Sequence, residues 1–377
     1  MNKVATMLKP IRHINCSPAL IACQGLMQTF SLWLCKPEIK SADLTKASLS
    51  LPLPGLSLSV IEADWLWDFL QKKVKTITLL ENAQTLANLD NVLKHNLETW
   101  LRGSASVAQH FSLPRKPLSW PIQKPFADND EGKKQWKAFQ TLMESFYEKG
   151  LRQGLPYRPD GVPTTVDNEG VTYKTFRAEF LQAHRQDLHP DSREVCVLCG
   201  GELSNTSVDH WIAKASYPLL SVCADNMVPI CGECNQRPNK GDKDVYADGS
   251  FEDWFHPYKR HPNGSLKLDY DNATLAVTVG CTDPADQKRV KHLNDLLNLE
   301  SRWTRELKAE YRKLQKAVMI SRYKTNKPFD TKQLYQWLED WRDGLIASEP
   351  HYEVHQILAK ALLDPVRATA WRDELLS

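Results

Sequence analysis

The chain has 377 residues, which is long enough for two or three folded domains. A hydrophobic fraction of 42% and a charged fraction of 25% are typical of a globular protein with a sizeable core. The 48 basic and 46 acidic residues leave a net charge of only +2, which excludes a protein that is basic over its whole surface. Any surface that binds nucleic acid must therefore be local.

The first apolar stretch is where a targeting or membrane segment would lie. Residues 14–35 contain no charged side chain and follow Lys3, Lys9 and Arg12, as in a signal peptide. Glutamine and serine residues interrupt the stretch, however, and its apolar residues recur every three or four positions, which predicts an amphipathic helix instead of a membrane span. The nine cysteines include five without framework spacing, which favours a reducing compartment. We therefore expect a cytoplasmic protein with no membrane partner.

Residues 1–112 are predicted to form an N-terminal helical region. Residues 49–61 alternate serine and leucine around Pro52 and Pro54, which indicates a turn or an edge ribbon because proline cannot serve a central strand. Residues 61–101 have helical spacing, and Gly103 offers a place for the helix to stop. The apolar stripe of this stretch is Leu86, Leu89, Leu93, Leu97 and Trp100.

Residues 113–189 are predicted to be a proline-rich linker with connecting helices. The prolines of residues 113–132 resist both helix and sheet. They are Pro114, Pro117, Pro121 and Pro125. A helix with one apolar face follows around Trp136 and Phe139, and residues 173–186 are predicted to form a short helix that leads into the next module.

Two C-x2-C pairs dominate residues 190–260. Cys196 and Cys199 form the first pair, and Cys231 and Cys234 form the second after a spacer of 31 residues. Thiolates spaced in this way can hold one ion from a tight turn, and four thiolates fill the tetrahedral shell of Zn²⁺. Paired spacings in an intracellular chain indicate zinc instead of disulfides. Because four sulfur ligands leave no position for water, this zinc is predicted to be structural.

Polar residues suited to catalysis lie inside and just after the cysteine pairs. Asp209 precedes His210, and Asn235 follows the last cysteine. His210 can take a proton from water near neutral pH without a large pKa shift, and Asp209 and Asn235 offer oxygen ligands of the kind that Mg²⁺ accepts. Strands are predicted over 207–212 and 226–230. A helix is predicted to begin near residue 234 or 235, which would put a metal ligand at a helix N-terminus.

This order of residues resembles the HNH endonucleases, the ββα-metal nuclease family, in their four-cysteine zinc-containing form. The family pattern runs C-x2-C, Asp-His, Asn before an apolar strand, C-x2-C-Asn and then Lys-Gly. This chain matches it at Cys196, Cys199, Asp209, His210, Asn226, Cys231, Cys234 and Asn235. The resemblance covers residues 190–260. The FHPY stretch at 255–258 and the segments after it also look like stand-alone bacterial HNH proteins, some of which are anti-phage effectors.

The resemblance implies a role for each polar residue of the pattern. His210 would be the general base, and Asp209 and Asn235 would hold a catalytic Mg²⁺ or Mn²⁺. Asn226 would brace the loop that carries His210.

One departure from the pattern leaves a metal ligand open. The Lys-Gly pair, Lys240-Gly241, follows the last asparagine less closely than in the family, so Asn239 is an alternative to Asn235 as ligand. We prefer Asn235 because it keeps the family's position beside the zinc cysteine. Lys240 is also predicted to contact nucleic acid.

Residues 261–377 are predicted to form a β-hairpin and a C-terminal helical region. Alternating apolar residues at 266–270 and 275–279 flank an Asp-Asn turn. A helix begins near residue 290, a longer one covers about 301–322, and two or three shorter helices follow. The long helix has an apolar stripe, formed by Trp303, Leu307, Tyr311, Leu314 and Val318.

The same helix has a separate basic stripe. Residues 301–327 contain nine Lys or Arg against two Glu. The basic stripe consists of Arg305, Lys308, Arg312 and Lys316. These side chains are either a contact surface for DNA phosphates or a solvated helix face, because such stripes are common on helices.

The sequence as a whole predicts an α+β, predominantly α-helical protein with a zinc-stapled ββα-metal (HNH) module flanked by helical regions. The resemblance implies a metal-dependent endonuclease that hydrolyses phosphodiester bonds in DNA. It also suggests bacterial anti-phage defence or restriction, together with a partner such as an ATPase or sensor subunit. Two alternatives stay open: a non-catalytic zinc-stabilised module for nucleic-acid binding or scaffolding, and a nuclease that cuts RNA.

Overall fold

The structure is a computed structural model that describes residues 9–50, 56–105, 107–111, 120–166, 168–185, 187, 189, 191–262, 264–325 and 330–376. Within these residues helices predominate, and the strands form three two-stranded antiparallel sheets. The predicted α+β class with a helical majority is therefore confirmed.

The N-terminal part is a group of helices around an apolar core. Helix α1 (Ser17–Leu34) was predicted, and its stripe from Leu20 to Leu34 is buried. The other elements of this part are η1 (Ser41–Asp43), α2 (Lys46–Ser50), α3 (Val60–Leu70), β1 (Lys73–Val74), β2 (Ile77–Thr78), α4 (Leu79–Ala87), α5 (Asn91–Ser104) and η2 (Val107–Phe111).

Two details of this part differ from the prediction. The helical spacing over 61–101 belongs to three separate helices, because Ser59, Thr78 and Asp90 each accept a hydrogen bond from a backbone N–H three residues later and so start α3, α4 and α5. The last of them runs through Gly103 and ends at Ser104. Residues 49 and 50 belong to α2 instead of a ribbon, and Pro52 and Pro54 lie outside the described residues.

The connecting region contains α6 (Asp130–Ser145), which continues into a π-helical turn, η3 (Phe146–Leu151), and later α7 (Tyr173–Ala183). Pro114 and Pro117 of the predicted linker lie outside the described residues. The described end of that segment packs against the rest of the protein, since Trp120 is buried and its backbone N–H donates to the carbonyl of Gly249 over 3.0 Å.

The central part is built on strands β3 (Ser207–His210) and β4 (Met227–Ile230), which pair antiparallel with Asp209 opposite Val228 and His210 opposite Met227. The 3-10 turn η4 (Pro218–Leu220) lies between them, and α8 (Gly232–Asn235) follows β4. Helices α1, α5 and α6 contact η4, so the N-terminal helices pack against this part.

The C-terminal part contains the predicted hairpin and helices. Strands β5 (Leu266–Asp271) and β6 (Ala276–Cys281) pair antiparallel and pack on the helices. The helices and the short turn before them are η5 (Pro284–Asp286), α9 (Gln287–Leu297), α10 (Leu299–Thr325), α11 (Thr331–Asp343), α12 (Tyr352–Leu362) and α13 (Pro365–Leu376). The predicted stripe of α10 is confirmed, since Trp303, Leu307, Leu314 and Val318 are buried and Tyr311 packs against the core.

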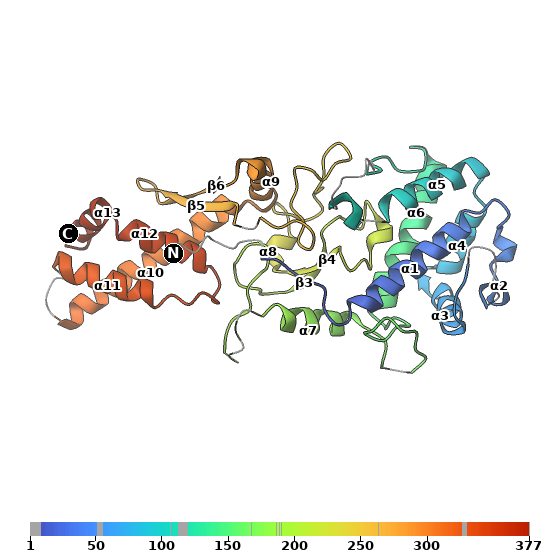
Figure 1. Ribbon diagram of the computed structural model, residues 1–377, viewed down its shortest axis with the longest axis horizontal. Coiled ribbons are helices and arrows are strands. Elements are labelled where there is room, and N and C mark those ends of the chain that lie inside the picture. Colours follow the sequence, from blue (N-terminus) through green and yellow to red (C-terminus); the bar gives the residue numbers. More distant parts are fainter. Residues whose placement is uncertain are drawn as a thin grey trace.

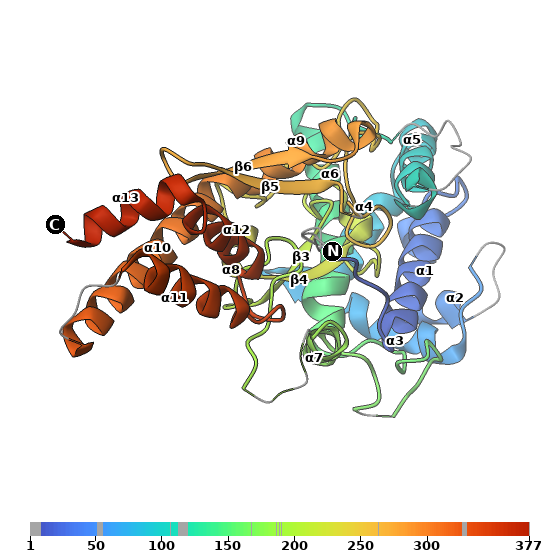
Figure 2. The same ribbon diagram turned by 60° about the vertical axis from the view of Figure 1, so that its left-hand side comes forward.

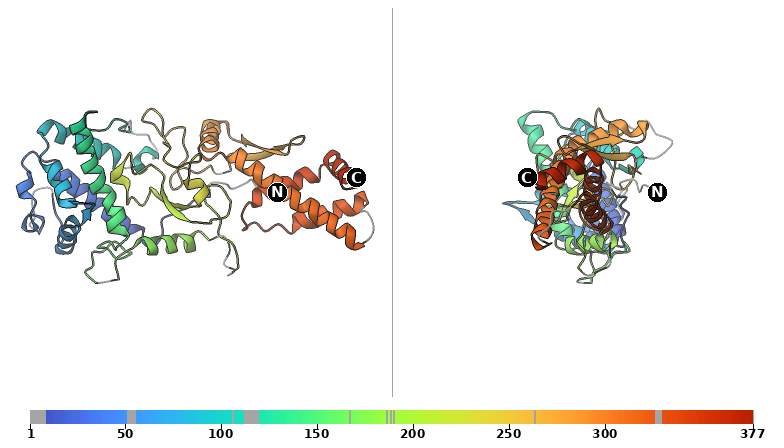
Figure 3. Two further views of the ribbon diagram at one scale, coloured as in Figure 1. Left: turned by 180° about the vertical axis from the view of Figure 1, so that it is seen from behind. Right: turned by 90° about the vertical axis from the view of Figure 1, so that its left-hand side faces the viewer.

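The molecule is elongated along one axis. Figure 1 shows α1–α6 at one end, β3, β4 and α8 in the middle, and α10–α13 at the other end. The hairpin β5–β6 lies alongside α10 and α12 (Figure 2). The view from behind in Figure 3 shows the same order of parts. No helix among the described residues is both long and apolar enough to cross a membrane.

Candidate metal centre and active site

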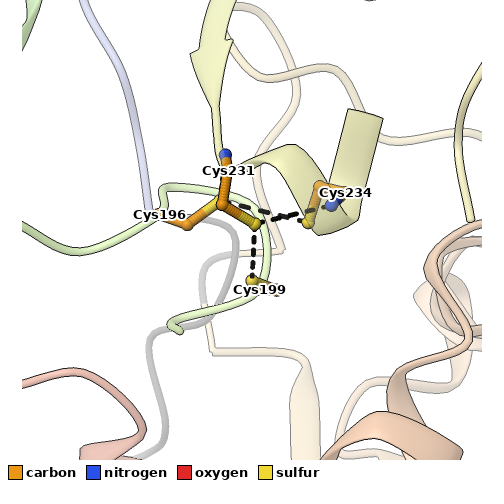
Figure 4. A group of neighbouring side chains, drawn as sticks. All are labelled: Cys196, Cys199, Cys231 and Cys234. Carbon is orange, nitrogen blue, oxygen red and sulfur yellow. Dashed lines mark hydrogen bonds between the residues drawn. The ribbon is translucent and has the colours of Figure 1, made fainter. Parts of the chain in front are cut away.

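The four paired cysteines meet in one buried cluster, drawn in Figure 4. Their sulfur atoms all lie within 4.8 Å of one another. Cys196 Sγ and Cys234 Sγ are 4.0 Å apart, and Cys199 Sγ and Cys231 Sγ are 3.8 Å apart. A tetrahedron with zinc–sulfur bonds of about 2.3 Å has sulfur–sulfur edges of about 3.8 Å. The cluster can therefore hold the predicted structural zinc ion.

Two tight turns present these sulfur atoms. In the first, the backbone N–H of Cys196 donates to Gly201 and that of Gly200 donates back to Cys196, with Gly200 at a positive φ of 69°. In the second, Cys231 caps α8, and its sulfur accepts a hydrogen bond from the N–H of Cys234. The cluster joins the segment before β3 to the residues after β4, so a bound zinc would fasten both ends of this hairpin.

The C-terminal helices contact the cysteine cluster directly, which the sequence did not predict. Arg302 on α10 lies with Nη1 3.3 Å from Cys234 Sγ and Nη2 3.1 Å from Glu233. The indole N–H of Trp303 donates to the carbonyl of Cys199 over 3.1 Å. The guanidinium group would offset part of the negative charge that four thiolates bring to a zinc ion. The only sequence sign of this contact is an arginine on the edge of an apolar stripe.

His210 lies at the end of β3 and is 6% exposed. Its Nε2 donates to the carbonyl of Ser221 over 2.8 Å, and its ring meets Tyr147 edge to face at 4.9 Å. Burial is the main reason that the pKa of His210 falls to about 3, so the imidazole is neutral at pH 7.

Asn226 is fully buried and joins two segments near His210. Its Oδ1 accepts from the N–H of Ile212 over 2.7 Å, and its Nδ2 donates to the carbonyls of Ile212 and Leu220. These bonds connect the residues just after β3 to the turn before β4. They fit the bracing role that the family resemblance implies for Asn226.

Asp209 forms an ion pair with Lys240 inside the protein. Lys240 Nζ lies 2.7 Å from Asp209 Oδ2, and the two side chains are 0% and 9% exposed respectively. Oδ2 of Asp209 is therefore buried with the ammonium group of Lys240 as its charged partner. Burial raises the pKa of Asp209, and the charge of Lys240 opposes that rise.

Lys240 is held by its surroundings as well as by this carboxylate. It also donates to the carbonyls of His210 and Gly241, over 2.9 and 3.3 Å. In this position Lys240 does not reach solvent. A contact between Lys240 and nucleic acid, as predicted from the sequence, would require it to leave this site.

The two asparagines considered as metal ligands lie in different places. Asn235 Nδ2 donates to Ser207 Oγ over 2.8 Å, which brings its amide beside β3. Asn239 instead donates to the carbonyl of Glu233 and accepts from Asn298 of the C-terminal part. Since Ser207 and Asp209 project from the same face of β3, the structure brings Asn235 to the side of the strand that carries Asp209.

The expected helix N-terminus beside Asn235 is wrong. Helix α8 begins at Gly232, is a single turn, and ends at Asn235. Proline at 238 disfavours helical backbone at Arg237, and Gln236 already has an extended conformation. Backbone donors at a helix start are therefore not available to phosphate at this asparagine.

The basic stripe lies on the exposed face of α10, with all four side chains exposed. Arg305 forms an ion pair with Glu233, which lies between Cys231 and Cys234. The stripe therefore starts at the edge of the cysteine cluster and runs away from it along α10.

The comparisons with known proteins give one local similarity. The chain is 33% identical over 78 residues to Protein ea31 of Escherichia phage lambda, a match that covers 20% of this chain and 25% of the relative. The chain thus spans about a quarter of the length of that relative. No family model matches the chain. No solved structure matches it either.

Proposed function

We propose that this protein is a metal-dependent endonuclease of the HNH type that cuts DNA at a site formed by Asp209, His210 and Asn235. The observation that carries the proposal is the hydrogen bond from His210 Nε2 to the carbonyl of Ser221. A carbonyl only accepts, so Nε2 holds the proton and Nδ1 keeps a lone pair that can take a proton from water. An imidazole oriented in this way by a third group is the arrangement that a general base needs.

The surroundings of His210 support the same role. Burial keeps the imidazole of His210 unprotonated at neutral pH, as a base must be before it acts, but its lowered pKa also makes it a weak base until water enters the site. Asn226 connects the segments on both sides of the carbonyl that orients His210. This bracing would limit the loss of alignment during proton transfer.

Asp209 and Asn235 are the residues that would hold the catalytic cation. They lie toward the same face of β3, and a carboxylate with an amide oxygen suits a hard cation such as Mg²⁺ or Mn²⁺. A cation bound there would polarise the phosphoryl oxygen and stabilise the departing 3′-oxygen. Since Lys240 occupies the carboxylate of Asp209, its ammonium group has to move away before the cation binds.

A second candidate function is a zinc-stabilised module that binds nucleic acid or acts as a scaffold without cutting it. The observation that favours it is the enclosure of the same residues: His210 is 6% exposed, and Lys240 already neutralises Asp209. In that case the polar residues would serve folding alone, and the basic stripe would supply the binding surface. Defence against phage, with an ATPase or sensor subunit as partner, is suggested by the family resemblance alone.

The test is cleavage by the purified full-length protein. Supercoiled plasmid and a structured RNA are each incubated with the protein, with and without Mg²⁺ or Mn²⁺. Plasmid cleavage that needs the metal is expected, and His210→Ala should lower its rate by about 10²- to 10⁴-fold while one zinc per chain is retained. His95→Ala, which alters an exposed histidine on α5, is the matched control and should cut normally.

Three outcomes would decide against parts of this proposal. Wild-type cleavage rates in His210→Ala would remove His210 as the base. Binding of plasmid without cleavage in either metal would support the non-catalytic function. Cutting of RNA but not plasmid would change the substrate. Comparison of Asn235→Ala with Asn239→Ala identifies the metal ligand, since only replacement of the true ligand should raise the Mg²⁺ concentration needed for cleavage.

A further inference from the structure

A second group of possible metal ligands lies where α10 and α12 pack against each other. Glu306 and Glu310 of α10 and His355 of α12 offer carboxylate and imidazole atoms that all lie within 4.8 Å of one another. The two glutamates are four residues apart and so project from one face of α10. His351 is the N-cap residue of α12, four residues before His355, and its Nε2 lies 3.9 Å from Glu306 Oε2. Two side chains of α10, one of α12 and the N-cap residue of α12 therefore meet in one place.

The side chains of this group are partly buried, which is unfavourable for charged carboxylates. The side chains of Glu310 and His355 are 15% and 18% exposed. The neutralising contacts are limited: His355 Nε2 lies 3.2 Å from Glu306, and Lys313 Nζ lies 2.9 Å from Glu310. Lys313 is 69% exposed, and an ion pair to so exposed a side chain contributes little. Two half-buried carboxylates thus share weak compensation, which favours a cation.

His351 gives an observation that is independent of the carboxylates. Its Nδ1 is buried and has no hydrogen-bond partner among the described residues. Its backbone N–H donates to the carbonyl of Gly200 over 2.7 Å, in the turn that carries Cys196 and Cys199. The ring nitrogen that lies toward Glu306 is Nε2, so this nitrogen and not Nδ1 would bind an ion at the group.

We propose that Glu306, Glu310 and His355 form a second metal site, which takes a first-row divalent transition ion such as Zn²⁺, with His351 as the fourth donor. A mixed set of carboxylate oxygen and imidazole nitrogen is the set that such ions accept. Zinc bonds to these atoms are about 2.0–2.2 Å long, so the donors would have to draw closer by rotation of their side chains. The ion would fasten α12 to α10, next to the turn held by the four cysteines.

Metal binding by untagged full-length protein tests the proposal. The protein is first treated with a mild chelator, and retention of one zinc per chain at the buried cysteines is checked by elemental analysis. Titration with Co²⁺ should then show, besides any ion held by Asp209 and Asn235, one equivalent that depends on the second group and whose absorption lacks the charge-transfer bands of sulfur ligands. Glu310→Gln and His355→Gln should each weaken this binding by at least about tenfold. The change His95→Gln with Glu131→Gln alters exposed residues of α5 and α6 and should leave it unchanged.

The outcomes separate this site from the nuclease proposal. Absence of any cobalt bound beyond the zinc in wild-type protein would show that the group is only a set of ion pairs, and this result needs no variant to fold. Equal binding in Glu310→Gln and His355→Gln would place the cobalt elsewhere. A rise in the melting temperature on addition of Zn²⁺ should accompany binding in the wild type and disappear in both variants. Failure of plasmid cleavage has no bearing on any of these measurements.

Discussion

Replacement of Lys240 by methionine should show how strongly the buried ion pair with Asp209 contributes to the fold. Methionine keeps the length of the side chain and removes its charge, so the carboxylate of Asp209 would stay buried without a counter-charge. Both side chains are almost fully buried, at 0% and 9% exposure, so solvent screens the pair very little. Removal of one partner of such a pair costs about 3–5 kcal/mol of unfolding free energy.

The double change Asp209→Asn with Lys240→Met removes both charges and is the control for the size of the pair interaction. It should recover most of the loss, because replacement of a whole buried ion pair is often close to neutral. Urea unfolding, together with hydrogen exchange of peptides that cover 207–230, measures both the global and the local free energy. A cost below about 1 kcal/mol for Lys240→Met, or a double variant as unstable as the summed single ones, would refute this reasoning.

The pH and metal dependence of Lys240→Met adds a test of the catalytic proposal. The pKa of Asp209 is raised in the folded protein, and loss of Lys240 should raise it further. A carboxyl group with a raised folded pKa binds more protons when folded, so its contribution favours the fold at low pH and is lost as pH rises through that pKa. The deficit of Lys240→Met should therefore shrink on acidification. It should also shrink in millimolar Mg²⁺ if Asp209 is a metal ligand, but not if the carboxylate is only structural.

Two further predictions follow from side chains outside this pair. His256 is fully buried and accepts a hydrogen bond at Nδ1 from the N–H of Tyr258, and burial lowers its pKa to about 3. Since the unfolded state then binds more protons, the free energy of unfolding should fall as pH drops from 6.5 toward 3. His256→Gln should reduce the dependence of this free energy on pH by about one proton, or about 1.4 kcal/mol per pH unit. An unchanged pH dependence in thermal unfolding would exclude His256 as its source. Arg312→Gln with Lys316→Gln should weaken DNA binding. If both side chains touch phosphate, the slope of log affinity against log salt concentration should become less negative by about two. An unchanged slope would mean that the basic stripe is a solvated helix face.

The local features of the central part could be predicted because each rests on short-range spacing. The two C-x2-C pairs bring their sulfur atoms together, and the strands predicted over 207–212 and 226–230 are present as the slightly shorter β3 and β4. The helix predicted to begin near residue 234 was misplaced, because α8 begins at Gly232 with Cys231 as its cap and ends at Asn235, although Pro238 was a stop signal already visible in the sequence. The sequence thus predicted the metal cluster better than the backbone that follows it.

Contacts between distant segments could not be predicted. Lys240 was predicted to contact nucleic acid, whereas the fold encloses it against Asp209, 31 positions earlier in the numbering. Arg302 reaches Cys234 from another helix, and its place on the edge of the apolar stripe of α10 does not indicate which segment it contacts. The positions of lysine and arginine in the sequence do not show whether such a side chain is a buried counter-charge or binds a ligand. The difference depends on which carboxylate the fold brings near the side chain.

The contacts around the cysteine cluster limit what removal of zinc can reveal. Trp303 and His351 bond to carbonyls of the turn at 199–200, and Arg302 contacts Cys234, so loss of zinc should loosen the C-terminal helices together with β3 and β4. A protein stripped of this zinc would then lose cleavage, nucleic-acid binding and the second metal site together, whichever function is correct. Only changes that keep all four cysteines can tell the candidate functions apart. His210, Lys240 and Glu310 meet this condition, since none of them is bonded to the four sulfur atoms.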